Sequence, residues 1–273
     1  MALRYLEEKA VESFREKIYA YYACNKREFP WRNTSDPYRI LVSEFMLQQT
    51  QTSRVMPKYL DFIEAFPTIG SLADSEWRDV VTLWKGLGYY RRALRLLETA
   101  RTIAHDYGGH VPCDRKVLLS LPGIGPYTAG AMRAFAFGIP DIVIDTNIRA
   151  LYIHFFYDGK GRVKDAELSG HVWMTCDKEN PREWYYALMD YGATIKKTCG
   201  NISKISSSYR KQTPFEGSRR QIRAEILKVL VTGDYPLDDI AVLTDRSKEH
   251  VVIALKSLMK DGTVHKYDNK YRL

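Results

Sequence analysis

Apolar residues recur at helical spacing along most of the chain. Near the N-terminus, Ala10, Phe14 and Ile18 continue a spacing of four that begins at Leu6, which predicts a helix over about 2–24. Strand-like alternation is almost absent before residue 260, so we expect an all-α main body. Proline, glycine, serine and aspartate mark the ends of further predicted helices at about 37–49, 52–65, 69–74, 76–85, 90–106, 114–120, 126–137 and 144–156.

The C-terminal end has the pattern of a separate module. Residues 195–221 are polar, basic and rich in serine, as in a linker or a segment that wraps around another domain. Helices are predicted after it at 219–231, 237–245 and 247–262, and residues 263–273 alternate around an Asp-Asn turn, as a β-hairpin does. This order is typical of a winged helix, whose third helix usually enters the major groove of DNA, although winged helices also serve in protein contacts.

Positive charge is concentrated at the same end of the chain. The 273 residues are 45% hydrophobic and 27% charged, as in an ordinary globular protein, and their formal net charge is +8. Residues 196–273 contain 16 Lys and Arg against 9 Asp and Glu, which favours a polyanionic partner bound by this region. The chain has no apolar run long enough for a membrane span and no signal-peptide pattern, so we expect no membrane association and a cytoplasmic protein.

Residues 121–125, with the sequence LPGIG, connect two predicted helices. Glycines at 123 and 125 permit backbone conformations that expose N–H groups at the start of the second helix, where a phosphate binds readily. A glycine turn between helices is also common in α-helical proteins that bind nothing. Its context favours the phosphate site, because Tyr127 and Thr128 follow just inside the helix and Asp145 begins the next helix.

Two acidic residues are candidates for chemistry. Asp145 is suited to cap a helix, yet a carboxylate beside a DNA backbone is electrostatically costly and needs a further reason. Breaking a glycosidic bond supplies one, because positive charge develops on the sugar and a fixed carboxylate stabilises it. Glu44, within the otherwise apolar ILVSEFML, is the candidate acid for the leaving base. The alternative is that Glu44 lies on the polar face of an amphipathic helix.

Longer motifs surround these residues in a fixed order. They are PWRNTSDPY (30–38), SEFMLQQTQ (43–51), GLGYYRRA (86–93), LPGIGPYTAGA (121–131), IDTN (144–147) and WYYALMDYGA (184–193). Over about residues 29–195 the chain thereby resembles the MutY branch of the helix-hairpin-helix DNA glycosylases, to which SEFMLQQTQ and GLGYY are specific. The resemblance implies a two-lobed all-α fold that binds double-stranded DNA containing a mismatch or a damaged base, with the target nucleotide flipped into a pocket.

The resemblance assigns roles to individual residues. Glu44 matches the general acid that protonates the departing purine and positions water, and Asp145 matches the carboxylate that stabilises the oxocarbenium-like sugar. Tyr127 matches a tyrosine beside the acid, at the position where bifunctional relatives carry the Schiff-base lysine, so we expect a monofunctional enzyme. The other matches are residues that wedge into the duplex, contact the orphaned base or hold a phosphate (Leu47, Gln48, Gln49, Tyr89, Gly123, Gly125 and Thr128) and residues that line the base pocket (Arg32, Asn147 and Tyr186).

The resemblance also sets expectations for domains and cofactors. The glycosylase domain is expected over 1–215, with a six-helix lobe at about 30–136 and a second lobe from 1–29 and 137–215, followed by a winged-helix module at 216–273. Most members carry four cysteines around an iron-sulfur cluster, whereas only Cys199 remains in that stretch here, so we expect no cluster and no other metal centre. The resemblance implies a monovalent cation, K⁺ or Na⁺, at the backbone carbonyls of Leu119, Leu121 and Ile124. We expect a monomer.

The main functional hypothesis is a base excision repair enzyme that removes adenine opposite G or 8-oxoguanine by hydrolysing the N-glycosidic bond. Two departures from the branch leave alternatives open. MutY proteins read 8-oxoguanine with a C-terminal domain that resembles a nucleotide hydrolase, and Tyr186 stands where a Gln or Glu contacts the flipped adenine. A T/U mismatch glycosylase is therefore an alternative. A non-catalytic DNA-binding protein is another, although it gains nothing from two acids that face phosphate.

Overall fold

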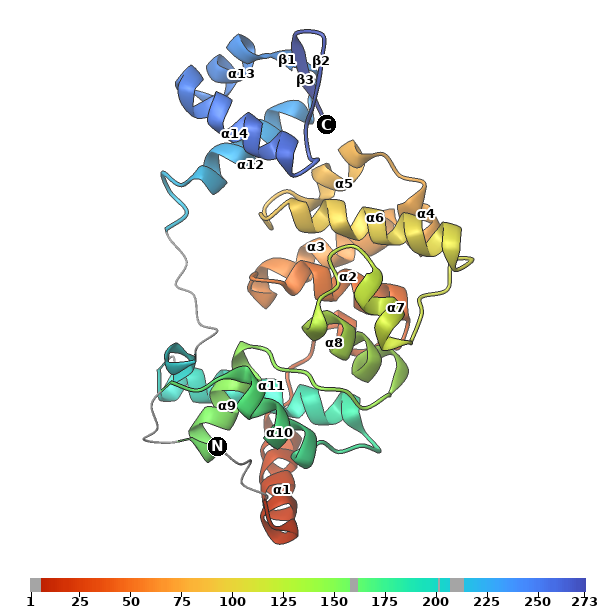
Figure 1. The fold of residues 1–273 in the computed structure, drawn as a ribbon, viewed down its shortest axis with the longest axis vertical. Coiled ribbons are helices and arrows are strands. Elements are labelled where there is room, and N and C mark those ends of the chain that lie inside the picture. The colour runs from red at the N-terminus through yellow and green to blue at the C-terminus, as the bar shows by residue number, and fades with distance from the viewer. Residues whose placement is uncertain (1–5, 158–161, 201, 207–213) are drawn as a thin grey trace. The chain divides into compact units, whose positions relative to one another are not determined.

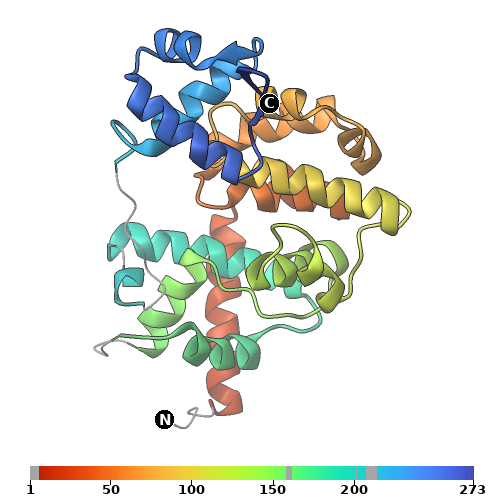
Figure 2. The same cartoon turned by 45° about the horizontal axis from the view of Figure 1, so that its top comes forward.

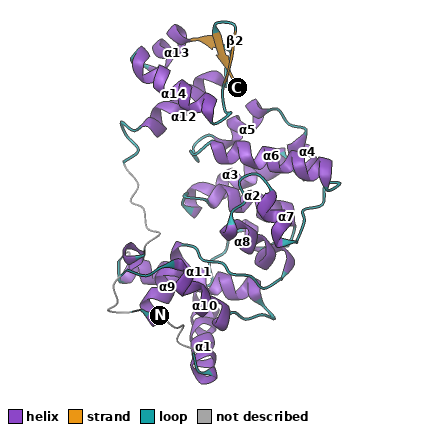
Figure 3. Ribbon diagram, in the orientation of Figure 1, coloured by secondary structure: helices purple, strands orange, loops and turns teal. Residues whose placement is uncertain are grey.

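The computed structural model describes residues 6–157, 162–200, 202–206 and 214–273, and it is mostly helical (Figure 1). Within these ranges, strands occur only in the C-terminal module, apart from a single bridge between Val163 and Ser206 (Figure 3). The helical main body predicted from the hydrophobic pattern is thus confirmed. The chain forms two compact units, one of Met1–Ile40, Cys113–Ser120 and Ile124–Lys211 and the other of Leu41–Pro112, Leu121–Gly123 and Gln212–Leu273.

The first unit is built around helices α9 and α11, which lie side by side in Figures 1 and 2. Trp184 of α11 and Leu151 and Tyr152 of α9 are fully buried in its core. Gly192 allows the close packing of these helices, because a Cβ at this position would overlap the backbone carbonyl of Asn147. The elements are α1 (Glu8–Asn25), η1 (Pro30–Arg32), α7 (Arg115–Ser120), α8 (Pro126–Phe137), α9 (Thr146–Phe156), α10 (Asp165–Thr175), α11 (Pro181–Thr198) and η2 (Ile202–Ile205).

The second unit contains the middle helices of the chain and the C-terminal module. Its helical core is filled by fully buried side chains that include Phe62, Leu72, Trp84 and Leu96. The middle helices are α3 (Thr52–Ala65), α4 (Ile69–Ala73), α5 (Trp77–Trp84) and α6 (Arg91–Asp106). Helix α2 (Pro37–Leu47) runs across the boundary of the two units in the sequence, and its residues from Leu41 onward belong to the second.

The C-terminal module has three helices and a small antiparallel sheet, in the element order of a winged helix. Strand β3 lies between β1 and β2, with Tyr235 opposite Tyr271 and Tyr267 opposite Lys270. Asp268 takes a left-handed φ of 49° in the predicted hairpin turn, which is confirmed. The elements are α12 (Arg219–Leu230), β1 (Tyr235–Pro236), α13 (Leu237–Thr244), α14 (Lys248–Lys260), β2 (His265–Tyr267) and β3 (Lys270–Arg272).

Helix α5 anchors this module to the rest of the second unit. The indole Nε1 of Trp77 donates a hydrogen bond to the carbonyl of Thr263 over 2.9 Å. The guanidinium of Arg78 donates to the carbonyls of Leu230 and Val231, both at 2.7 Å, just after the last turn of α12. A cationic group near the C-terminal end of a helix is stabilising. The hydrogen bonds from Arg78 therefore stabilise the attachment of α12 to α5.

The predicted helices are present, with small differences at their ends. The helix predicted over 37–49 ends at Leu47, because Gln49 adopts a left-handed φ of 57°. The N-terminal helix begins at Glu8, and part of the prediction, residues 2–5, lies outside the described residues. Helices α10 and α11 were not predicted. Helix α11 is buried on most of its sides, so it lacks the single apolar stripe that identifies an amphipathic helix. The six-helix lobe predicted over 30–136 includes α7 and α8. In the structure these two helices belong to the first compact unit.

Candidate active site

Helix α2 holds one buried carboxyl group. Glu44 is its only acidic residue and is 4% exposed. Every side chain from Leu41 to Met46 is buried, so this part of the helix has no face toward solvent. The alternative assignment of Glu44 to the polar face of an amphipathic helix is therefore wrong.

Arg92 of α6 fixes the chain at the end of α2. Its buried guanidinium donates to the carbonyls of Phe45 and Met46 at 2.8 and 2.9 Å, and it also donates to the carbonyl of Gln48. A further bond of 3.2 Å reaches the carbonyl of Gly88 in the loop before α6. Burial lowers the pKa of Arg92 to about 10, which leaves it cationic at neutral pH at the negative end of the α2 dipole.

The loops that Arg92 joins carry the residues predicted to wedge into the duplex. Leu47 and Gln48 are half-buried, Gln49 is exposed and Tyr89 is half-buried. Gln49 and Tyr89 have left-handed φ values of 57° and 50°, a conformation that costs a residue with a side chain about 1 kcal/mol. The sequence does not single out Arg92, because the carbonyls that it reaches are set by the fold.

The LPGIG segment forms the predicted turn between α7 and α8. Gly123 has a φ of 79°, and a Cβ there would lie 2.7 Å from the Cβ of Arg95 and 2.9 Å from a ring carbon of Phe45. Only glycine therefore fits this position, for both reasons. Helix α8 begins after Gly125 with Pro126, so its cap residue offers no side chain to the N–H groups of the first turn.

Tyr127 and Thr128 lie in that first turn of α8. Tyr127 is half-buried and Thr128 is buried. A monovalent cation was predicted to bind the backbone carbonyls of Leu119, Leu121 and Ile124. The side chain of Leu119 is partly exposed, and those of Leu121 and Ile124 are buried. The cation site stays a prediction.

Asp145 caps helix α9 with both of its carboxylate oxygens engaged. Its Oδ1 accepts hydrogen bonds from the backbone N–H groups of Asn147 and Ile148 over 2.9 and 2.7 Å, and its Oδ2 accepts one from the Asn147 side chain over 2.9 Å. Lys196 of α11 donates to the Oδ1 of Asn147 over 3.1 Å. Burial raises the pKa of Asp145, and the two backbone N–H groups and the Lys196 ammonium limit the rise. The sequence does not single out Lys196, because its partner Asn147 lies on another helix.

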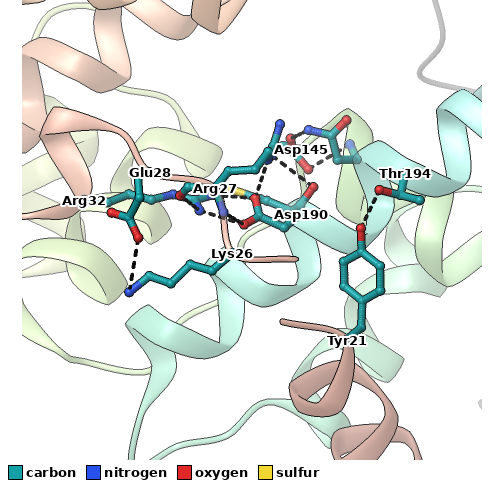
Figure 4. Close-up of polar contacts among 10 residues, drawn as sticks. Tyr21, Lys26, Arg27, Glu28, Arg32, Asp145, Asp190 and Thr194 are labelled. Carbon is teal, nitrogen blue, oxygen red and sulfur yellow. Dashed lines mark hydrogen bonds and ion pairs between the residues drawn. The ribbon is translucent and has the colours of Figure 1, made fainter. Parts of the chain in front are cut away.

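Two predicted pocket residues, Arg32 and Tyr186, lie in one cluster with Asp190. Figure 4 shows the ion pair of Arg32 with Asp190. Arg32 donates to both oxygens of Asp190 over 2.9 and 2.8 Å, and Arg27 adds a bond of 2.7 Å. The guanidinium of Arg32 also lies 4.5 Å from the ring centroid of Tyr186, which stacks on Phe135. These contacts compensate the buried Asp190 carboxylate and hold α11 against the residues before α2. Contact with a base stays a prediction for Arg32, Asn147 and Tyr186.

The cysteines lie apart from one another. Cys24, Cys113 and Cys199 are exposed and Cys176 is buried. Among the residues that the structure describes, no group of three His, Cys, Asp or Glu side chains is placed to hold a metal ion. No described helix combines the length and the apolar content that a membrane crossing requires.

The protein family that this chain matches and its individual relatives agree with the motifs. Residues 42–172 match the HhH-GPD superfamily base excision DNA repair proteins. The adenine DNA glycosylase of Mycobacterium tuberculosis is 34% identical over 271 residues, which cover 90% of this chain and 88% of the relative. That of Mycolicibacterium smegmatis is 35% identical over 272 residues, 91% of each protein. The adenine DNA glycosylase of Homo sapiens is 35% identical over 197 residues, 68% of this chain and 36% of the human protein.

Solved structures show the same fold. A thermostable thymine-DNA glycosylase superposes with a TM-score of 0.62 at 29% identity, covering 74% of this chain and 97% of that chain. Endonuclease III in a non-covalent complex with DNA gives a TM-score of 0.60 at 19% identity, covering 71% and 89%, and supports the fold alone. The predicted helix-hairpin-helix glycosylase fold is thus confirmed, and the chain belongs to the HhH-GPD superfamily of base excision DNA repair proteins, in the family of the adenine DNA glycosylases.

Proposed function

We propose that this protein excises adenine paired with guanine or 8-oxoguanine from double-stranded DNA, as a monofunctional glycosylase of base excision repair. Relatives named adenine DNA glycosylase match this chain over about nine-tenths of their own length. The observation that carries the proposal is the burial of Glu44, which is 4% exposed, because a carboxyl group is costly to bury and one kept inside the protein points to chemistry.

The reaction then divides between two carboxyl groups. Glu44 donates its proton to a ring nitrogen of the adenine as the bond between C1′ and N9 breaks, and the bonding electrons leave with the base. Asp145 stabilises the positive charge that develops on the sugar, since its carboxylate is fixed by three N–H donors. Water adds to C1′ and gives a proton to the Glu44 carboxylate, which restores the acid.

We further propose that the protein does not cut the DNA strand. Strand cleavage by relatives of this fold requires a lysine amine that forms a Schiff base with the sugar, and the chain carries Tyr127 at that position. A phenol cannot form this adduct. The product is therefore an abasic site in an intact strand.

An iron-sulfur cluster does not fit the residues present. A cluster of this kind takes four cysteine ligands, and Cys199 is the only cysteine after α11 begins. Cys24 and Cys113 are exposed at distant points of the sequence, and no metal-binding group was found among the described side chains. We infer that the protein functions without an iron-sulfur cluster, and no step of the reaction depends on one.

Single-turnover excision on four duplexes tests the proposal. The duplexes hold A opposite 8-oxoguanine, A opposite G, T opposite G and U opposite G, and each reaction is developed with and without hot alkali. We expect cleavage of the adenine strand only, and only after alkali. Cleavage without alkali would contradict the monofunctional assignment. Release of T or U alone would identify a pyrimidine mismatch enzyme, for which the similarity to a thymine-DNA glycosylase is the supporting observation.

A further inference from the structure

The second unit contains a groove whose walls come from two distant parts of the chain. Its volume is about 1040 Å³. One wall is formed by the loop 87–90 and the start of α6, and the other by α12 of the C-terminal module. Among the described residues that line it, seven are arginines and only Asp261 is acidic. The groove is therefore strongly cationic.

The first turn of α12 places two arginines where the helix itself carries partial positive charge. Arg219 and Arg220 occupy the first turn of the helix, which contains no acidic residue. The N-terminal end of a helix carries partial positive charge, so cations there are repelled by the helix dipole as well as by one another. Arg219 is exposed and its neighbour Arg220 is half-buried. A phosphate would relieve this repulsion, because guanidinium groups bind phosphate oxygens through paired hydrogen bonds.

Arg220 also connects the module to the predicted wedge residues. Its Nη1 donates to the hydroxyl of Tyr89 over 2.7 Å, and its guanidinium carbon lies 5.5 Å from the centroid of that ring. Tyr89 has a left-handed backbone and needs external contacts to hold it. Gln48, Gln49 and Tyr89 all line the groove. The C-terminal module thus completes the surface that carries these three residues.

We propose that this groove binds the DNA backbone, with Arg219 on a phosphate and Arg220 as a positioning residue for Tyr89. The proposal rests on the glycosylase function proposed above. Charge selects the occupant, because a nucleic acid strand carries one phosphate charge per nucleotide and the groove has a large excess of arginine. The C-terminal module of this chain takes part in DNA binding through α12, the first helix of the winged helix.

Binding of a duplex at several salt concentrations tests the phosphate contact. The duplex holds 2′-fluoro-2′-deoxyadenosine opposite 8-oxoguanine, since the fluorine destabilises the sugar cation and suppresses excision. Arg219→Ala is expected to weaken binding about fivefold and to lower the slope of log K against log salt concentration by about 0.9. Lys228→Ala is the matched control, because Lys228 is an exposed cation on the same helix outside the groove. It should change neither quantity. Equal effects of the two variants would overturn the proposal.

A double-mutant cycle tests the positioning role of Arg220. Arg220→Ala and Tyr89→Phe each remove one side of the same hydrogen bond. The measured quantity is the single-turnover rate for A opposite 8-oxoguanine divided by the rate for A opposite G. Each single variant is expected to reduce this ratio about fivefold, and the double variant should reduce it no further than either single variant. Multiplying effects would show that the residues act separately and would overturn the role.

The outcomes separate this proposal from the proposed function. A wild-type protein that releases no base from any duplex would contradict the glycosylase function. A wild-type protein that excises adenine, with Arg219→Ala indistinguishable from it in affinity and salt dependence, would contradict only the groove proposal. Tight binding of a polyglutamate peptide by the wild type but not by Arg219→Ala, with DNA binding unchanged, would assign the groove to an acidic protein segment instead.

Discussion

Glu44 and Asp145 are two carboxyl groups at opposite kinds of position on a helix. Glu44 lies in the interior of α2, where the backbone N–H groups are already used by the helix and the neighbouring residues along the helix are buried. Asp145 precedes α9, where N–H groups of the first turn point at its carboxylate. Burial raises the pKa of Asp145, and the hydrogen bonds from the first turn of α9 oppose that rise. The comparison teaches that the position of a carboxyl group on a helix decides whether backbone N–H groups can bind it, and this difference supports the separate roles proposed above.

Removing the proton donor should have the largest effect. Glu44→Gln keeps the size of the side chain but cannot protonate the base, so the single-turnover rate should fall about 10³-fold. Affinity for the duplex should stay within about tenfold, because the acid acts in the transition state. Excision assays and binding titrations with the same DNA check this. A Glu44→Gln protein that excises at the normal rate would remove Glu44 from the mechanism.

Neutralising the second carboxyl group should have the next largest effect. Asp145→Asn keeps an oxygen that caps α9 but loses the negative charge, so the rate of excision should fall about 10²-fold. The folded state should be as stable as the wild type. Undiminished excision would show that Asp145 is only a helix cap, which is the structural alternative to its catalytic role.

The pH dependence should reflect the environment of Asp145. Burial raises the pKa of Asp145 above its ordinary value, so the ionised form needed for catalysis is lost at a higher pH than for a free carboxyl group, about 3.9. Below the raised pKa the rate should fall about tenfold per pH unit. Because the folded pKa is the higher one, protonation of Asp145 does not itself unfold the protein.

Single-turnover rates and circular dichroism over the same pH range check this dependence. We expect the rate to fall on the acid side while the helical signal is unchanged. A rate that stays constant down to the ordinary carboxyl range would contradict the assignment to Asp145, as would a loss that follows unfolding.

The smallest effect should be on stability, and it separates the two roles of Asp145. Asp145→Ala removes the cap and should lower the free energy of unfolding by about 1 kcal/mol, whereas Asp145→Asn should leave it nearly unchanged. Urea denaturation of both variants measures the difference. Equal stabilities would mean that the hydrogen bonds to Asn147 and Ile148 contribute little.

Local pattern predicted most of the fold, because it depends on neighbours in the sequence. Helix α3 was predicted at its observed ends, and the hairpin after α14 formed around its Asp-Asn turn. Helix α11 was not predicted, because it is buried on most of its sides. The sequence pattern does not reveal why residue 192 must be glycine. The reason is that a Cβ there would overlap the backbone carbonyl of Asn147 on another helix.

The candidate site was predicted in part for the same reason. The motif residues Glu44, Asp145 and Gly123 were singled out by their type and local context, and the structure gives each a specific environment. Arg92 and Arg220 were missed, since their importance comes from long-range hydrogen bonds to Gln48 and Tyr89. A sequence shows that an arginine is present, but its partners follow from the fold.

The most direct test of the central claim is to identify the base released from a duplex that holds A opposite 8-oxoguanine. Chromatography and mass spectrometry of the small-molecule fraction would be applied to the wild type and to Glu44→Gln under single-turnover conditions. We predict free adenine in an amount equal to the enzyme-bound duplex from the wild type, almost none from Glu44→Gln, and an uncut strand in both. No adenine from the wild type, or equal adenine from both proteins, would contradict the account.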